Sequence, residues 1–196
     1  AGRGSGGGRG ASEAVLTRIR QEQDRGIYSR ALKEITAGRK TGHWIWYIWP
    51  CLQALRPNTS RPMFLLPDLV AVQQYLRDEV LSRRLLEITE VATNHLRSGM
   101  PPATLFGGHT DAEKFAETMT FFAVAARESG EEASLQCFLA ALEALGGRGN
   151  AKGQLDARTM QTIVLTYRMR HYADVRIADQ LRSKDEGFAC CLHGDT

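Results

Sequence analysis

The sequence lacks several features that would assign a class of protein at once. It has no apolar run near the ~18 residues of a membrane-spanning helix and no signal-peptide segment, so we expect a soluble protein. Neither sign of charge dominates, because 25 Lys and Arg stand against 22 Asp and Glu, for a net charge of +3. This balance argues against a dedicated binder of duplex DNA, which concentrates basic residues on one face.

Cysteine is also scarce, and its placement indicates no metal site. The chain has 4 cysteines, at positions 51, 137, 190 and 191, with no Cys-x-x-Cys pair and no zinc-type spacing to a histidine. The CCLH stretch at 190–193 lacks the further ligands that a soft metal needs. We therefore predict no metal and no cofactor. We expect a reducing intracellular compartment, with cytoplasm and organelle matrix both open.

Large apolar side chains are missing from the first ten residues, AGRGSGGGRG. Such a segment cannot bury enough surface to offset its ordering entropy, so we expect residues 1–11 to form a disordered Gly/Arg-rich tail. Two interpretations stay open. The tail is either a passive linker or leader remnant, or an arm in which Arg3 and Arg9 bind an anionic partner such as RNA.

Helical periodicity dominates residues 12–167. Apolar residues recur at steps of three and four within 12–35, 68–76, 80–92, 115–126, 132–145 and 160–167. Gly26 should bend the first helix, Asp68 and Asp156 should cap two others, and Thr110 to Glu113 has the form of a capping box. We predict an all-α, compact single domain of about five to seven helices around a Trp-rich core segment.

That core segment is HWIWYIWP at 43–50, which holds all 3 tryptophans of the chain. It is the one candidate strand, but large apolar residues occupy every position from 44 to 49, so neither a half-exposed strand nor an amphipathic helix fits. Each ring can bury ~150–250 Å². We expect all three indoles to be enclosed at the centre of the core. The alternative is an aromatic cage for a cationic or planar ligand.

The stretch QDRGIYSRALKEITAGRKTGHWIWYIWP at 23–50 resembles the signature of domain-of-unknown-function family 1810. LFG at 105–107, DAEKFAETMTFFA at 111–123 and LDART at 155–159 follow in the family's order. The resemblance covers about residues 16–166 and implies a mainly helical domain with no known activity. This chain departs from the family pattern at Gly42, where serine is common, at Cys51, where glutamine is typical, and at Glu117-Thr118, where a serine pair is frequent.

Three polar residues in those motifs form a candidate catalytic site. His43 follows Arg39 and Lys40 and adjoins the aromatic run, a setting expected to keep the imidazole neutral, either as a base or as a partner of a buried carbonyl. Asp111 and Lys114 lie three apart in the first turn of a helix and share one face. They either position an anion or form only a solvated pair at the helix start. We hypothesise that all three converge at one pocket.

Beyond the domain, the YRMRHY stretch at 167–172 leads into a basic extension over residues 168–196. Arg168 and Arg170 alternate with aromatic residues, a mix typical of contacts to single-stranded nucleic acid, although a solvated, partner-facing helix fits as well. We predict a non-catalytic interaction or structural module, an accessory subunit that docks through its tails on a larger protein or RNA-protein assembly. The alternative is an enzyme acting on a small polar or nucleotide-like ligand through His43, Asp111 and Lys114.

Overall fold

The computed structural model describes residues 6–146 and 156–166. Over these residues the fold is all-α, as predicted, and the strand-like pairing is an isolated bridge between Leu52 and Leu66. The described ranges contain seven helices of nine residues or more: α1 (Gly6–Glu22), α2 (Tyr28–Thr36), α4 (Leu69–Arg77), α5 (Glu79–Arg97), α7 (His109–Ser129), α8 (Glu132–Leu145) and α9 (Ala157–Thr166). Shorter elements are η1 (Gln23–Ile27), α3 (Ile45–Ile48), η2 (Pro62–Phe64) and α6 (Pro102–Phe106).

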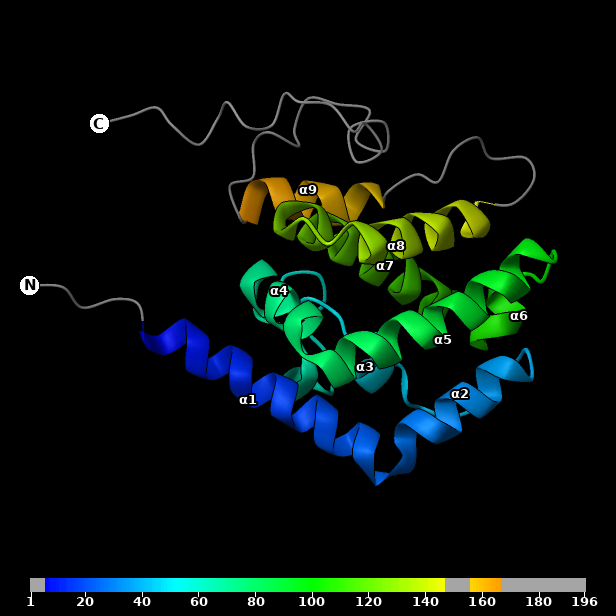
Figure 1. Ribbon diagram of the computed structural model, residues 1–196, viewed down its shortest axis with the longest axis horizontal. Coiled ribbons are helices and arrows are strands. Elements are labelled where there is room, and N and C mark those ends of the chain that lie inside the picture. The colour runs from blue at the N-terminus through cyan, green and yellow to red at the C-terminus, as the bar shows by residue number, and fades with distance from the viewer. Residues whose placement is uncertain (1–5, 147–155, 167–196) are drawn as a thin grey trace, which may run out of the picture.

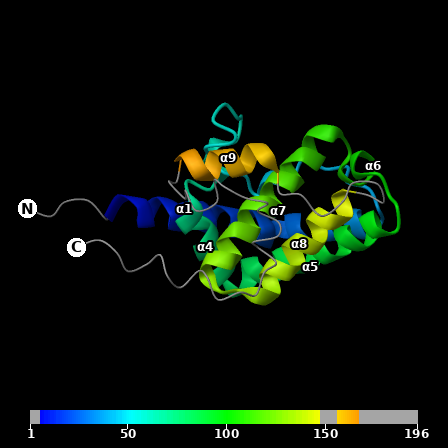
Figure 2. The same cartoon turned by 90° about the horizontal axis from the view of Figure 1, so that it is seen from above.

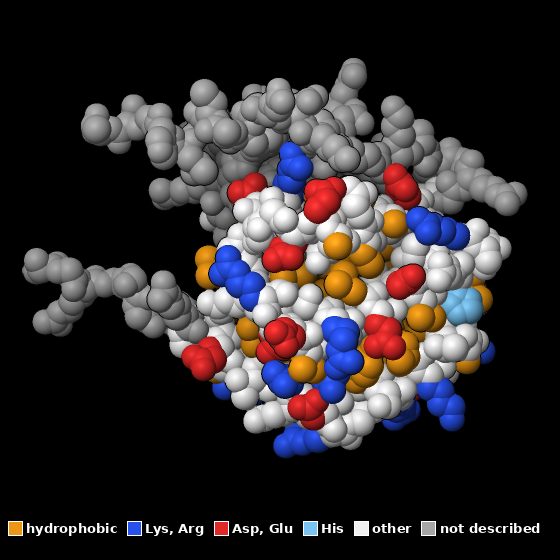
Figure 3. Space-filling model, in the orientation of Figure 1, with side chains coloured by type: hydrophobic (Ala, Val, Ile, Leu, Met, Phe, Trp, Pro, Cys, Tyr) orange, Lys and Arg blue, Asp and Glu red, His pale blue; other side chains and the backbone are white. Residues whose placement is uncertain are grey.

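The helices are arranged in layers. Figure 1 shows α1 and α2 as a V along one side of the molecule and α9 along the opposite side, with α7 and α8 between them. Figure 2 looks onto α9 from above. Over the described part of the face in Figure 3, basic and acidic side chains are interspersed. No described helix is both long and apolar enough to cross a membrane.

Gly26 bends the first helix, as predicted, because it takes a φ of 100° within η1. The buried side chain of Gln23 fixes the bend by donating to the carbonyl of Tyr47 over 2.7 Å. The start of α1 differs from the expectation, since the helix begins at Gly6 rather than at Ser12. Extending an existing helix needs no new nucleation, so the glycines at its start add only their own cost of roughly 1 kcal/mol each relative to alanine.

Two of the predicted caps are confirmed and one is wrong. Asp68 accepts from the Ala71 N–H over 2.8 Å at the start of α4, and Asp156 accepts from the Thr159 N–H over 2.9 Å at the start of α9. The capping box at 110–113 does not form, because α7 already begins at His109, with Gly108 as its N-cap and no side-chain cap. The positive φ of Gly107 and Gly108 lets the chain turn directly from α6 into α7.

The aromatic run is not a strand, because its centre forms the single turn α3. Trp44 and Trp49 are buried at 1% and 0% exposure, and the Trp49 ring packs edge-on against Phe106 and Phe115. The expectation that all three indoles are enclosed is wrong for Trp46, which is partly exposed. A one-turn helix points side chains in several directions, and the side chain of Trp46 packs against the edge of the core with part of its ring open to solvent.

Candidate functional site

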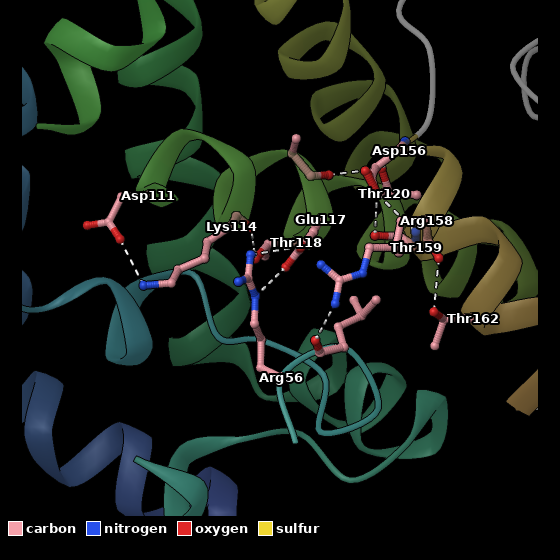
Figure 4. Close-up of polar contacts among 12 residues, drawn as sticks. Arg56, Asp111, Lys114, Glu117, Thr118, Thr120, Asp156, Arg158, Thr159 and Thr162 are labelled. Carbon is pink, nitrogen blue, oxygen red and sulfur yellow. Dashed lines mark hydrogen bonds and ion pairs between the residues drawn. The ribbon is translucent and has the colours of Figure 1, made fainter. Parts of the chain in front are cut away.

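Five polar side chains within residues 111–120 of α7 contact other parts of the chain. Asp111, Lys114 and Thr118 follow one another at steps of three and four residues and share one face, whereas Glu117 and Thr120 lie further around the helix, toward Arg56 and α9. We call this set the α7 ridge: Asp111, Lys114, Glu117, Thr118 and Thr120. Figure 4 shows Glu117 facing Arg56, Thr120 near Asp156 at the start of α9, and Asp111 beside Lys114. All but Asp111 are buried. Buried polar groups need partners, so the ridge is where the fold concentrates its polar contacts.

At the N-terminal end of the ridge, one carboxylate joins two lysines. Lys114 Nζ lies 2.9 Å from Asp111 Oδ1, and Lys40 Nζ lies 2.6 Å from Asp111 Oδ2. The side chains of Lys40 and Lys114 are only 7% and 11% exposed. Burial alone would raise the pKa of Asp111, but the bonds from the two lysines outweigh it and lower that pKa. We call these three residues the Lys-Asp-Lys cluster.

Both ammonium groups of the cluster also lie over indole rings. Lys114 Nζ is 4.2 Å from the ring centroid of Trp46, and Lys40 Nζ is 5.2 Å from that of Trp44. Each such contact contributes about 0.5–2 kcal/mol, depending on desolvation. The aromatic run therefore does hold cations, and they are the chain's own lysines.

The backbone of Lys40 is fixed against the end of α6. Its N–H donates to the Leu105 carbonyl over 2.8 Å. At Gly107 a Cβ atom would come within 2.8 Å of the Lys40 carbonyl oxygen, so a residue without a side chain is needed there. These contacts bring Lys40, distant in sequence, to the first turn of α7.

Glu34 holds the rest of the loop that carries Lys40. Its Oε2 accepts from the N–H groups of Thr41 and Gly42 over 2.7 and 2.8 Å and from Trp44 Nε1 over 2.8 Å. Burial would raise the pKa of Glu34, but these bonds, with one from Arg30, lower it to about 2. A Cβ on Gly42 would stand 2.5 Å from Trp44 Cδ1, so any residue larger than glycine at this position would force the indole of Trp44 to move.

Glu34→Gln should reduce the loss of unfolding free energy that the wild type shows as pH falls from about 4.5 toward 2. The folded-state pKa of about 2 lies below the value of 4.5 for the free side chain, so this contribution is complete above about pH 4.5 and is lost as pH falls toward 2. We expect the variant to lose about 2 kcal/mol of unfolding free energy at pH 7 and to converge with the wild type near pH 2. Urea unfolding across pH measures this. Arg30→Gln, which keeps the backbone bonds to Glu34, should still lose stability as pH falls toward 2, as the wild type does.

The structure brings together two of the three predicted catalytic residues. Asp111 and Lys114 form an ion pair, whereas His43 is exposed and has no hydrogen bond or ion pair to either within the described part of the chain. The burial expected around His43 is absent because its side chain points outward from the loop. The residue that completes the cluster is Lys40, whose only sequence signal was its basic charge after a helix end.

Further along the ridge, a bidentate ion pair joins α7 to the loop after α3. Arg56 Nε and Nη2 lie 3.0 and 2.9 Å from the two carboxylate oxygens of Glu117 (Figure 4). Burial raises the pKa of Glu117, and Arg56 opposes that rise. The Thr118 hydroxyl is 3.1 Å from the Pro50 carbonyl. Positions 51 and 117–118, where this chain departs from the family pattern, therefore lie together at this junction.

The helix α9 is hydrogen-bonded to the same junction. Thr120 Oγ1 accepts from the Asp156 N–H over 2.9 Å, and Arg158 donates to the Leu55 carbonyl over 3.3 Å. The polar groups at this end of the ridge are thus paired with the chain itself, which indicates a structural role for them.

The described cysteines are not poised for nucleophilic or metal chemistry. Burial raises the pKa of the Cys51 thiol to about 12 and that of Cys137 to about 11, so both are protonated near neutral pH. Among the described residues no group of three His, Cys, Asp or Glu could hold a metal ion. Cys190 and Cys191 lie outside the described ranges.

Two hollows of the described surface lie away from the Lys-Asp-Lys cluster. One of about 710 Å³ is lined by α1 and α4, including Arg20 and Arg77. Another of about 350 Å³ lies between α5 and α8, including Cys137. The lining of neither includes any of the three predicted catalytic residues.

The predicted nucleic-acid or partner contacts fall mostly beyond what the structure describes. Arg3, Arg168 and Arg170 lie outside the described residues. Arg9 lies in α1, and only its backbone is described. These contacts stay predictions.

The chain matches a family model and is similar to a solved structure. Residues 13–163 match the family model described as "Protein of unknown function (DUF1810)". The crystal structure of the conserved hypothetical protein Rv1873 from Mycobacterium tuberculosis is similar, with 30% sequence identity and a TM-score of 0.61. The similarity covers 76% of this chain and 96% of that one. The search of curated proteins found no match.

Proposed function

We propose that this chain, which belongs to the DUF1810 family of proteins of unknown function, is a non-catalytic binding module whose ligand carries an anionic group held by Lys40 and Lys114. One observation carries the proposal: among the described residues, two nearly buried ammonium groups share a single carboxylate as ion-pair partner. Burying a charge without full compensation costs several kcal/mol. An external anion would supply the missing negative charge.

The surroundings of the cluster favour an anion as well. Asp111 lies in the first turn of α7, a helix of 21 residues whose N-terminus has no side-chain cap. The first N–H groups of a helix and its dipole favour negative charge there. The partly exposed ring of Trp46 provides an apolar wall beside Lys114.

Binding without catalysis fits the state of the side chains. Asp111 is kept ionised between its two lysines, and the Cys51 thiol is kept protonated, so neither is poised for proton transfer near neutral pH. The enzyme alternative would rest on His43, which no described contact joins to the cluster. Docking of the tails on a larger protein or RNA-protein assembly, as an accessory subunit, is a further part of the proposal.

Titration with inorganic phosphate at constant ionic strength, followed by ¹⁵N NMR, tests the anion site. We expect the amide signals of Lys40, Asp111 and Lys114 and the indole N–H of Trp46 to shift, with a dissociation constant of about 1 mM. Lys114→Gln should weaken binding at least about tenfold, a loss of ~1.4 kcal/mol.

The matched control for this titration is Lys33→Gln, which removes an exposed lysine of α2 and should bind phosphate like the wild type. Trp46→Phe identifies the reporting indole signal. Equal binding by Lys114→Gln and the wild type, or shifts scattered over all exposed lysines, would refute the proposed site.

A further inference from the structure

We infer that the ligand group is a dianion of the phosphoryl type, and that Asp111 is an internal competitor that this group displaces from Lys40 and Lys114. The inference rests on the proposed function and concerns the kind of anion and its exchange with the Asp111 carboxylate. Its starting point is that the cluster already holds an anion, the Asp111 carboxylate, which bridges the two ammonium groups at 2.6 and 2.9 Å.

The donors of the two lysines exceed the acceptors around them. An ammonium group has three N–H donors, yet Lys40 and Lys114 each have a single described acceptor, an oxygen of Asp111. With side chains 7% and 11% exposed, neither lysine is completely enclosed, so the donors not bonded to Asp111 can meet an acceptor that arrives from solvent. A group with three or more acceptor oxygens would satisfy more of these donors than a carboxylate with two.

A free monocarboxylate cannot compete well with Asp111. The chemical group is the same, and the aspartate is tethered beside the lysines at an effective concentration of mM or more. A phosphoryl or sulfate dianion differs in kind, because it brings two negative charges to two ammonium groups. A dianion is therefore attracted to the two lysines more strongly than the Asp111 carboxylate is. The cluster should bind dianions in preference to monoanions.

The fold can release Asp111 without losing the site. The side chain of Asp111 is 20% exposed, so the displaced carboxylate can turn to water. The loop that carries Lys40 keeps its other attachments, namely the bond from its N–H to Leu105 and the bonds from Glu34 to Thr41 and Gly42. Both lysines thus stay in place while their partner changes.

Removal of the competitor is the direct experiment. Sulfate, inorganic phosphate and acetate are titrated at pH 7.5 and constant ionic strength into the wild type, Asp111→Asn and Asp111→Glu, with ¹⁵N NMR as the readout. We expect the wild type to bind sulfate and phosphate at least about tenfold more tightly than acetate. Asp111→Asn should tighten the binding of all three ions and gain most for acetate. Asp111→Glu, which keeps a competing carboxylate, should behave like the wild type.

The outcomes separate this inference from the proposed function. Acetate binding as tightly as sulfate in the wild type would overturn the dianion class and leave anion binding intact. If Asp111→Asn binds sulfate no more tightly than the wild type does, the inference that the anion displaces Asp111 is wrong. Should Asp111→Asn prove unfolded by circular dichroism, Asp111→Ser provides the same comparison. If neither the wild type nor a folded variant binds any of the three ions, the proposed function itself is wrong.

Discussion

Trp49→Ala should lower the free energy of unfolding by about 4 kcal/mol, in line with large-to-small changes of buried aromatic residues. The indole is fully buried and touches Phe115 and Phe106 at centroid distances of 4.8 and 5.5 Å. Its Nε1 also donates to Thr89 over 3.0 Å, so truncation leaves a cavity and removes a buried hydrogen bond. Since domains are stable by about 5–15 kcal/mol, we expect urea unfolding to show a severely destabilised variant.

Trp46→Ala is the matched control within the same run of sequence. Its ring is partly exposed, and the main loss is its contact with the Lys114 ammonium, so we expect a cost of about 1 kcal/mol. Trp49→Phe should fall between the two, because it keeps an aromatic ring and loses the bond to Thr89. Equal costs for Trp46→Ala and Trp49→Ala would contradict the arrangement of the indoles described above.

Sequence predicted those parts of the fold that depend on local patterns. The helix over 132–145 was expected with the bounds that α8 has, since its apolar period and the glycines after it are both local. Gly26, Asp68 and Asp156 took their expected roles for the same reason: each acts on backbone within four residues.

The elements that sequence did not predict are short or depend on distant contacts. WIWYIW at 44–49 has large apolar residues at every position, so periodicity could not distinguish the turn α3 from a strand. The five-residue helix α6 follows shortly after the end of α5 at Arg97, and Pro102 is its first residue, where a proline lacks no needed hydrogen bond. Short elements of this kind are fixed by packing.

The same division holds for the site. Asp111 and Lys114 could be paired from sequence because they lie three apart on one helix. Lys40 and Arg56 could not be assigned, because tertiary structure alone brings them to α7. His43 was selected because it lies between Lys40 and the aromatic run, but Lys40 and Trp44 are buried whereas His43 is exposed.

Arg56→Met should lower the free energy of unfolding by about 3 kcal/mol, although no ligand contact is involved. Glu117 is 3% exposed, and Arg56 donates to both of its carboxylate oxygens. Methionine keeps the apolar stem of arginine, so the expected loss is that of a buried carboxylate left without its counter-charge. Arg158→Met is the control: Arg158 is exposed and makes one 3.3 Å bond to the Leu55 carbonyl, and its removal should cost less than about 1 kcal/mol.

The double variant Arg56→Met/Glu117→Met separates the charge from the packing. With both partners apolar no buried charge remains, so we expect most of the lost stability to return. Acidity provides a second test of Arg56→Met. Burial already holds the pKa of Glu117 above its usual 4.5, and removing Arg56 raises it further. The folded variant then takes up a proton at higher pH than the unfolded chain, so its stability should rise relative to the wild type as pH falls from 7 toward 5. A deficit that stays constant over this range would mean that the cost of Arg56→Met arises from lost packing.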